Sequence, residues 1–114
     1  MVMRIRWAAL LVFGMAMVAT LASSVIDGRV IAVHSDIMGC EAGCVTAAGG
    51  WPLPYLVDYP GISPVGSVSL SDALLGLDKI RPAALALTFV FWLCASATLV
   101  WAAMRRRVTA KAAR

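Results

Sequence analysis

The chain has 114 residues, of which 61% are hydrophobic and only 14% are charged, and its mean hydropathy is +0.86. A soluble domain usually carries about 25% charged residues, and a soluble chain of this length cannot bury so much apolar surface. The composition therefore excludes an ordinary soluble domain and indicates one structural unit in contact with lipid. The net charge of +4 does not indicate nucleic-acid binding, because the basic residues flank apolar segments.

The first element is an uncharged segment behind a basic N-terminus. Residues 7–26 carry no charge over twenty positions and follow Arg4 and Arg6. As a helix this segment would be about 30 Å long, which matches a hydrocarbon core of ~30 Å. We predict a cytoplasmic N-terminus over residues 1–6 and a transmembrane helix over residues 7–26. Alternatively, residues 1–24 form a cleaved signal peptide, which would leave a single span.

The next segment, residues 27–81, is too long for a structureless connection and is predicted to form a small extracytoplasmic unit. Its β-branched residues at 29–34 favour a short strand or the frayed end of the first helix. Residues 35–48 are expected to contain a short helix with Ser35 as its N-cap.

Cys40 and Cys44 form the one motif with chemical content in this segment. On a helix their Cα atoms would be about 6.2 Å apart, a distance that a disulfide accepts. Thiols outside the cytoplasm are usually oxidised, so we expect a structural disulfide. Two interpretations compete with it: copper binding together with His34 and Met38, and thiol exchange, for which redox enzymes prefer C-x-x-C. No resident cofactor is expected.

Residues 51–64 contain four prolines, which exclude a helix or a central strand. The aromatic side chains of this stretch suit either the outer membrane–water interface or the surface of a partner protein. These interface candidates are Trp51, Tyr55 and Tyr59.

A short helix over residues 72–79, capped by Ser69 or Ser71, is expected before the second span. Residues 82–104 then carry no charge over twenty-three positions, which corresponds to a helix of about 35 Å. The basic tail, residues 105–114, is predicted to anchor this span at anionic headgroups. The anchoring residues are Arg105, Arg106 and Arg107.

Together these elements predict an all-α membrane protein: a two-transmembrane-helix hairpin with an extracytoplasmic loop of about 55 residues that contains short helical pieces. Seven Lys and Arg residues lie on the side of the termini and three in the loop, which places both termini in the cytoplasm. Small and hydroxyl residues follow one face of each span, and we expect these faces to pack on each other or on a partner. The packing candidates are Ala9, Ala16 and Thr20 in the first span, and Thr88, Ala95 and Thr98 in the second.

The sequence contains no catalytic constellation, and neither span contains an ionisable residue. It therefore indicates neither an enzyme nor an ion-coupled transporter. The preferred hypothesis is a non-enzymatic accessory or scaffold subunit of a bacterial-type inner membrane. Its partners would be the lipid bilayer and another membrane protein or a second copy of itself. The alternatives are an extracytoplasmic copper- or thiol-handling protein that uses Cys40 and Cys44, and an oligomeric pore or membrane-stress protein.

Overall fold

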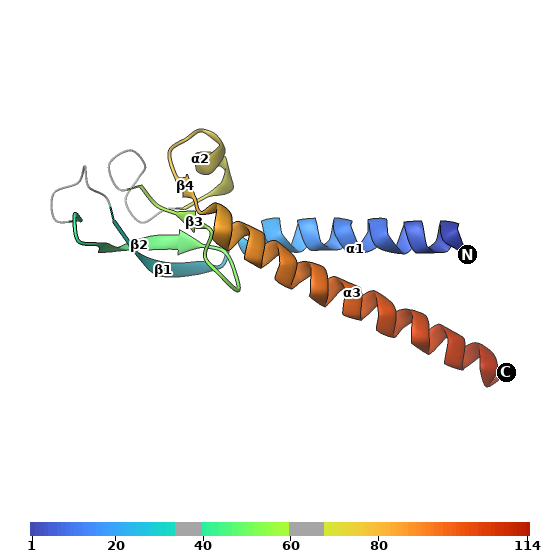
Figure 1. The fold of residues 1–114 in the computed structure, drawn as a ribbon. Coiled ribbons are helices and arrows are strands. Elements are labelled where there is room, and N and C mark those ends of the chain that lie inside the picture. Colours follow the sequence, from blue (N-terminus) through green and yellow to red (C-terminus); the bar gives the residue numbers. More distant parts are fainter. Residues whose placement is uncertain (34–39, 60–67) are drawn as a thin grey trace.

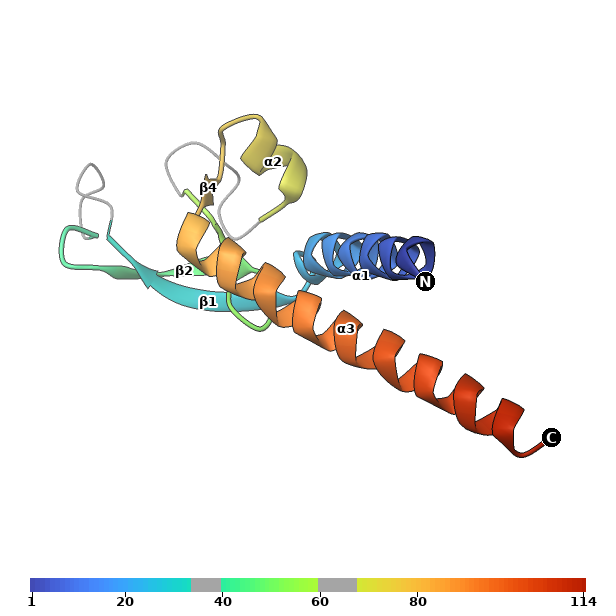
Figure 2. The same cartoon turned by 45° about the vertical axis from the view of Figure 1, so that its right-hand side comes forward.

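The computed structural model describes residues 1–33, 40–59 and 68–114, and it contains two long helices attached to a small antiparallel sheet (Figure 1). The molecule is elongated, with extents of 69 × 21 × 19 Å. Both long helices leave the sheet in the same direction, so the two chain ends lie at the same end of the molecule (Figures 1 and 2). The predicted hairpin of two helices, each long and apolar enough to cross a membrane, is therefore present.

The long helices are α1, Val2–Ser23, and α3, Pro82–Ala112. α1 ends where the hydroxyls of Ser23 and Ser24 donate to carbonyl oxygens of the preceding turn, each over 2.7 Å. α3 begins at the predicted residue, because proline is well tolerated in the first turn of a helix. It continues beyond the predicted span through the basic tail, whose alanine, arginine and lysine residues are good helix formers.

The sheet has four antiparallel strands in the order β1-β2-β3-β4. The strands are β1 Asp27–Ala32, β2 Cys44–Gly49, β3 Leu56–Val57 and β4 Lys79–Ile80. β1 pairs with β2 over six positions, from Asp27 opposite Gly49 to Ala32 opposite Cys44. The prediction of an all-α fold is therefore wrong between the two long helices.

The reason lies in pairing between distant segments. Of the two alternatives for residues 29–34, a short strand or the frayed end of the first helix, the strand is present as β1 up to Ala32. The helix expected over residues 35–48 is wrong from Cys44 onward, where β2 begins. Residues 34–39 lie outside the described part. Alanine-rich sequence favours a helix, but β2 lies between β1 and β3 and bonds its backbone to both.

The exclusion of a central strand from residues 51–64 is also wrong, since β3 lies inside the sheet between β2 and β4. This strand is only two residues long, Leu56 and Val57, and neither of them is a proline. The ladder therefore loses no hydrogen-bond donor.

The short helix α2, Leu70–Leu74, begins earlier and ends earlier than predicted. Its N-cap is Ser69, one of the two predicted residues, whose hydroxyl accepts from the backbone N–H of Asp72 over 3.1 Å. The chain then turns at Gly76, which has a φ of 78°, and enters β4.

The core joins the sheet to the beginning of α3. Tyr55, Leu56 and Ala84 are buried together. The backbone N–H of Arg81 donates to the carbonyl oxygen of Tyr55 over 2.7 Å. The residues that pack around this core are Val68, Leu70, Ala73 and Leu85. The first turn of α3 is thereby fixed on the sheet.

Candidate functional site

α1 and α3 pack against each other in the halves next to the sheet. The rings of Phe13 and Phe89 meet edge to face with centroids 5.6 Å apart. Towards the termini the two helices diverge (Figures 1 and 2), and every residue of α3 from Trp101 onward is exposed. The buried helix residues are Ala16, Thr20 and Ser23 in α1, and Ala84, Thr88 and Ser96 in α3.

The divergence of the helices separates the six predicted packing residues into two groups. Near the sheet, Ala16, Thr20 and Thr88 are buried, and farther along Ala95 is half-buried while Ala9 and Thr98 are exposed. Ser96, which the spacing in the sequence did not select, is buried beside Ala95. Its small polar side chain is the only local signal that marks it.

An apolar cleft of about 420 Å³ lies between the two long helices. Thr20 supplies the one polar side chain in its lining, and its hydroxyl donates to the carbonyl oxygen of Ala16 over 2.7 Å. The lining residues are Phe13, Met17, Thr20 and Leu21 of α1, and Pro82, Leu85, Ala86 and Phe89 of α3. Such a surface can hold apolar side chains or an acyl chain, but it offers no group for acid–base or nucleophilic chemistry.

An irregular loop, residues 51–55, lies along a different face of α3 and is called here the proline loop. The indole Nε1 of Trp92 donates to the carbonyl oxygen of Trp51 over 3.0 Å. The hydroxyl of Thr88 donates to the carbonyl oxygen of Leu53, also over 3.0 Å. Two carbonyl groups of the loop are therefore bonded by side chains of α3.

The proline loop also contacts α1. The hydroxyl of Tyr55 donates to the carbonyl oxygen of Thr20 over 2.6 Å. The ring of Trp51 packs against Phe91 and Trp92, with centroids 5.3 and 5.6 Å away. The loop thus connects the two long helices next to the sheet.

The three predicted interface residues have different surroundings. Trp51 is exposed, Tyr55 is only 1% exposed and contacts the chain's own helices, and Tyr59 is half-buried. The ammonium of Lys79 lies 4.5 Å from the centroid of the Tyr59 ring. Within this structure, Tyr55 is part of the core and presents no surface to a partner.

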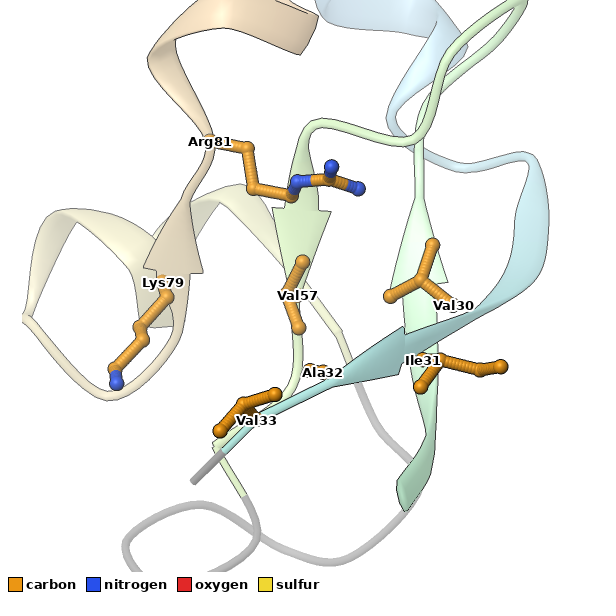
Figure 3. Close-up of a pocket in the computed structure, with 7 residues that line it drawn as sticks. All are labelled: Val30, Ile31, Ala32, Val33, Val57, Lys79 and Arg81. Carbon is orange, nitrogen blue, oxygen red and sulfur yellow. The ribbon is translucent and has the colours of Figure 1, made fainter. Parts of the chain in front are cut away.

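A second hollow, of about 270 Å³, lies on the sheet (Figure 3). Figure 3 shows the guanidinium of Arg81 reaching across β3 and the ammonium of Lys79 extending away from it. The apolar lining is formed by Val30, Ile31, Ala32, Val33 and Val57. The guanidinium of Arg81 beside an apolar wall can accept an anionic group such as a phosphate.

The sulfur atoms of Cys40 and Cys44 are bonded to each other, and the two Cα atoms are 4.9 Å apart. The pair does not lie on a helix: Cys40 begins a turn and Cys44 begins β2. A bridged pair offers no thiolate for metal binding or thiol exchange. His34 and Met38 lie outside the described residues, and within the described ranges no three His, Cys, Asp or Glu side chains gather in a way that could hold a metal ion.

The sequence did not indicate that two carboxylates are buried at facing positions of the sheet. Asp58 follows β3 and Asp78 precedes β4, and they are only 2% and 5% exposed. One carboxylate oxygen of Asp78 accepts from the backbone N–H of Ser69 over 3.2 Å; the other has no hydrogen-bond partner in the described part of the chain. Only the register of β3 with β4, which places Val57 opposite Lys79, brings the two residues together.

The basic residues Arg105, Arg106 and Arg107 are all exposed on the last turns of α3. The guanidinium of Arg105 lies 3.9 Å from the centroid of the Trp101 ring, a cation–π contact.

Comparisons with known proteins found no match: no protein-family model, curated protein or solved structure matches the chain.

Proposed function

We propose that this chain is a two-span protein of a bacterial-type inner membrane, with both termini in the cytoplasm, and that it acts as a non-enzymatic accessory subunit of a larger membrane complex. The cleft between α1 and α3 is the observation that carries the proposal. The expected partner is one transmembrane helix of another membrane protein.

The membrane placement is supported by the apolar side chains on the outside of both helices. Leu10 and Val18 of α1, and Leu87 and Leu99 of α3, are each more than half exposed. An apolar surface of this extent is unfavourable in water but is solvated by acyl chains. The excess of arginine and lysine at the termini supports the cytoplasmic location of both ends.

A partner helix is supported by the way in which the two helices diverge. Helices in lipid associate where small residues allow close approach. The small residues Ala9 and Thr98 are exposed because α1 and α3 separate towards the termini. Ala86 lies in the cleft between the larger Leu85 and Phe89. A third helix in the cleft would cover these surfaces.

Cysteine cross-linking in native membranes tests this assignment. In a Cys94→Ser background, Met17→Cys places a thiol in the cleft, whereas Val18→Cys places one on the neighbouring exposed surface. We expect a discrete adduct with another membrane protein from Met17→Cys and none from Val18→Cys. Equal adducts from both positions, or none from either, would contradict the proposal. An adduct of twice the chain mass would show a second copy as the partner.

A steric variant provides the complementary measurement. Ala86→Trp fills the cleft, while Ala83→Trp adds the same bulk at an exposed position that does not line it. Co-purification with the cross-linked partner should fall at least tenfold for Ala86→Trp and remain unchanged for Ala83→Trp.

A further inference from the structure

We infer that the proline loop lies inside the hydrocarbon region of the outer leaflet and that its exposed side chains contact acyl chains there. This inference rests on the membrane placement proposed above. It adds that part of the unit between the spans is embedded in the bilayer, rather than resting on its surface.

The depth of the loop follows first from α3. Met104 immediately precedes three arginines, which places it close to the boundary on the side of the termini. Along a helix, Trp92 is about 18 Å and Thr88 about 24 Å from Met104. In a hydrocarbon core of ~30 Å, these residues lie about 12 and 6 Å inside the outer boundary. Their hydrogen bonds hold the carbonyl groups of Trp51 and Leu53 at these levels.

The first helix provides an independent measure. Trp7 follows Arg6 at the same boundary, and Thr20 is about 20 Å from Trp7 along α1. Thr20 therefore lies about 10 Å inside the outer boundary, and its carbonyl oxygen accepts from the hydroxyl of Tyr55. Counted from its own arginine, α3 places the carbonyl groups of Trp51 and Leu53 in the outer leaflet, and α1 places the hydroxyl of Tyr55 there. The backbone of Tyr55 lies at the outer boundary, because its carbonyl oxygen accepts from the N–H of Arg81. A tilt of about 20° shortens these distances by only about 6%.

The chemistry of the loop suits this location. Irregular backbone is tolerated at membrane depth only where its polar groups are bonded within the protein. The carbonyl groups of Trp51 and Leu53 have side-chain donors from α3, and Pro52 and Pro54 have no N–H group to satisfy. The N–H groups of Trp51 and Leu53 and the carbonyl groups of the two prolines have no hydrogen-bond partner among the described residues. The N–H of Tyr55 donates to the carbonyl oxygen of Gly49 over 3.0 Å.

Two apolar side chains of the loop are partly exposed. Trp51 and Leu53 are 45% and 41% exposed. At the depths derived from α1 and α3, these apolar surfaces meet acyl chains. The indole of Trp51 packs against Phe91 and Trp92, and its remaining exposed surface contacts acyl chains.

Nitroxide labelling tests the depth directly. Single cysteines at Leu53, Leu87 and Leu74 are labelled in a Cys94→Ser background, with Cys40 and Cys44 left bridged. The protein is placed in vesicles of phosphatidylcholine and phosphatidylglycerol. Collision with dissolved oxygen reports the acyl region, and collision with a water-soluble nickel chelate reports the aqueous phase. Leu87 is 58% exposed on α3, and Leu74 is 84% exposed on α2.

We expect the Leu53 label to match the Leu87 label, with oxygen favoured at least tenfold more than at Leu74. A Leu53 label that meets nickel as readily as the Leu74 label, while Leu87 remains protected, would overturn the loop assignment alone. Exposure of both Leu53 and Leu87 to nickel would overturn the membrane placement as well. The unlabelled chain provides a second measurement, since quenching of tryptophan by lipids brominated on the acyl chains should fall in Trp51→Phe.

Discussion

Two threonines on α3 show how the same residue type acquires different roles. The hydroxyl of Thr88 donates to the carbonyl oxygen of Leu53 in the proline loop. The hydroxyl of Thr98 donates to the carbonyl oxygen of Ala95 in its own helix, over 2.8 Å. Both residues belong to the same small-residue stripe in the sequence, so the difference arises only from what lies opposite each of them.

Replacing each threonine with the isosteric valine should separate these roles. We expect Thr88→Val to lower the free energy of unfolding by about 1 kcal/mol, because the partly buried carbonyl group of Leu53 loses its donor. Thr98→Val should have a smaller effect, since only a hydrogen bond within one helix is lost. Unfolding in mixed micelles, followed by tryptophan fluorescence, measures both values. Equal losses would mean that the loop is not held by Thr88.

Gly50 is the residue at which the backbone constrains the loop most. It has a φ of 122°, and a Cβ atom there would lie 2.6 Å from Cδ1 of Tyr55 and 3.1 Å from the carbonyl oxygen of Leu53. Gly76 also has a positive φ, of 78°, but a Cβ atom at this position would have no neighbour within 4 Å among the described residues. The two glycines therefore share a positive φ, which would strain a residue with a side chain, and differ in the steric contact that such a side chain would make.

Alanine at these positions should give two different penalties. Gly76→Ala should lower the free energy of unfolding by about 1 kcal/mol, the cost of a left-handed backbone at a residue with a side chain. Gly50→Ala should lower it by about 3 kcal/mol or more, because the Tyr55 ring must also move. The same micelle unfolding assay compares them. Equal losses in the two variants would argue against close packing between Gly50 and Tyr55.

At the scale of elements, the disulfide between Cys40 and Cys44 joins the first residue of β2 to the segment just before it, and it does not link β2 to β1. A disulfide that closes so short a loop removes little entropy from the unfolded chain, corresponding to about 2 kcal/mol. The bridge lies at the end of β2 opposite to Gly49, which is the end connected to the proline loop. Its contribution should therefore remain local.

The variant Cys40→Ser/Cys44→Ser should lose no more than about 2 kcal/mol of stability. The bond from Tyr55 to Thr20 should persist, because the residues that form it do not contact the bridge. Micelle unfolding measures the loss, and cross-linking between Phe13→Cys and Phe89→Cys, in a background without Cys94, reports the helix contact. Loss of that cross-link on removal of the bridge would show that the hairpin controls the helices.

For the whole molecule, the orientation depends on where the positive charges lie. Seven of the ten lysine and arginine residues lie on the side of the termini. Removing the three arginines at 105–107 leaves four there against three in the segment between the helices, which nearly abolishes the bias. The hairpin itself would remain, because its core does not include these exposed residues.

A reporter fused after Arg114 should be active only in the cytoplasm for the unchanged chain. The variant with glutamine at 105–107 should give a mixture, with a measurable fraction of molecules inverted. Replacing Arg29, Lys79 and Arg81 with glutamine instead should keep the termini in the cytoplasm. A reporter that is active outside the cell in the unchanged chain would contradict the proposed orientation.

The two long helices were predictable from sequence, and the cap of α2 could be narrowed to Ser69 or Ser71, because uncharged length and a capping residue are local features. The sheet was not, since β2 and β3 acquire their strand conformation by pairing with each other and with β1 and β4. The packing face was predictable only in part: Thr20 and Thr88 are buried, but the divergence of the helices exposes Ala9 and Thr98.

The order of the amino acids alone determined two apolar helices of sufficient length and the concentration of positive charge beside the chain ends, because both are properties of contiguous residues. Tertiary structure alone decided that the segment between the helices forms a sheet and that its proline loop packs beside α3 and bonds to α1. The physical reason is that these features depend on hydrogen bonds between residues far apart in the chain: Tyr55 and Thr20 are 35 positions apart, as are Thr88 and Leu53.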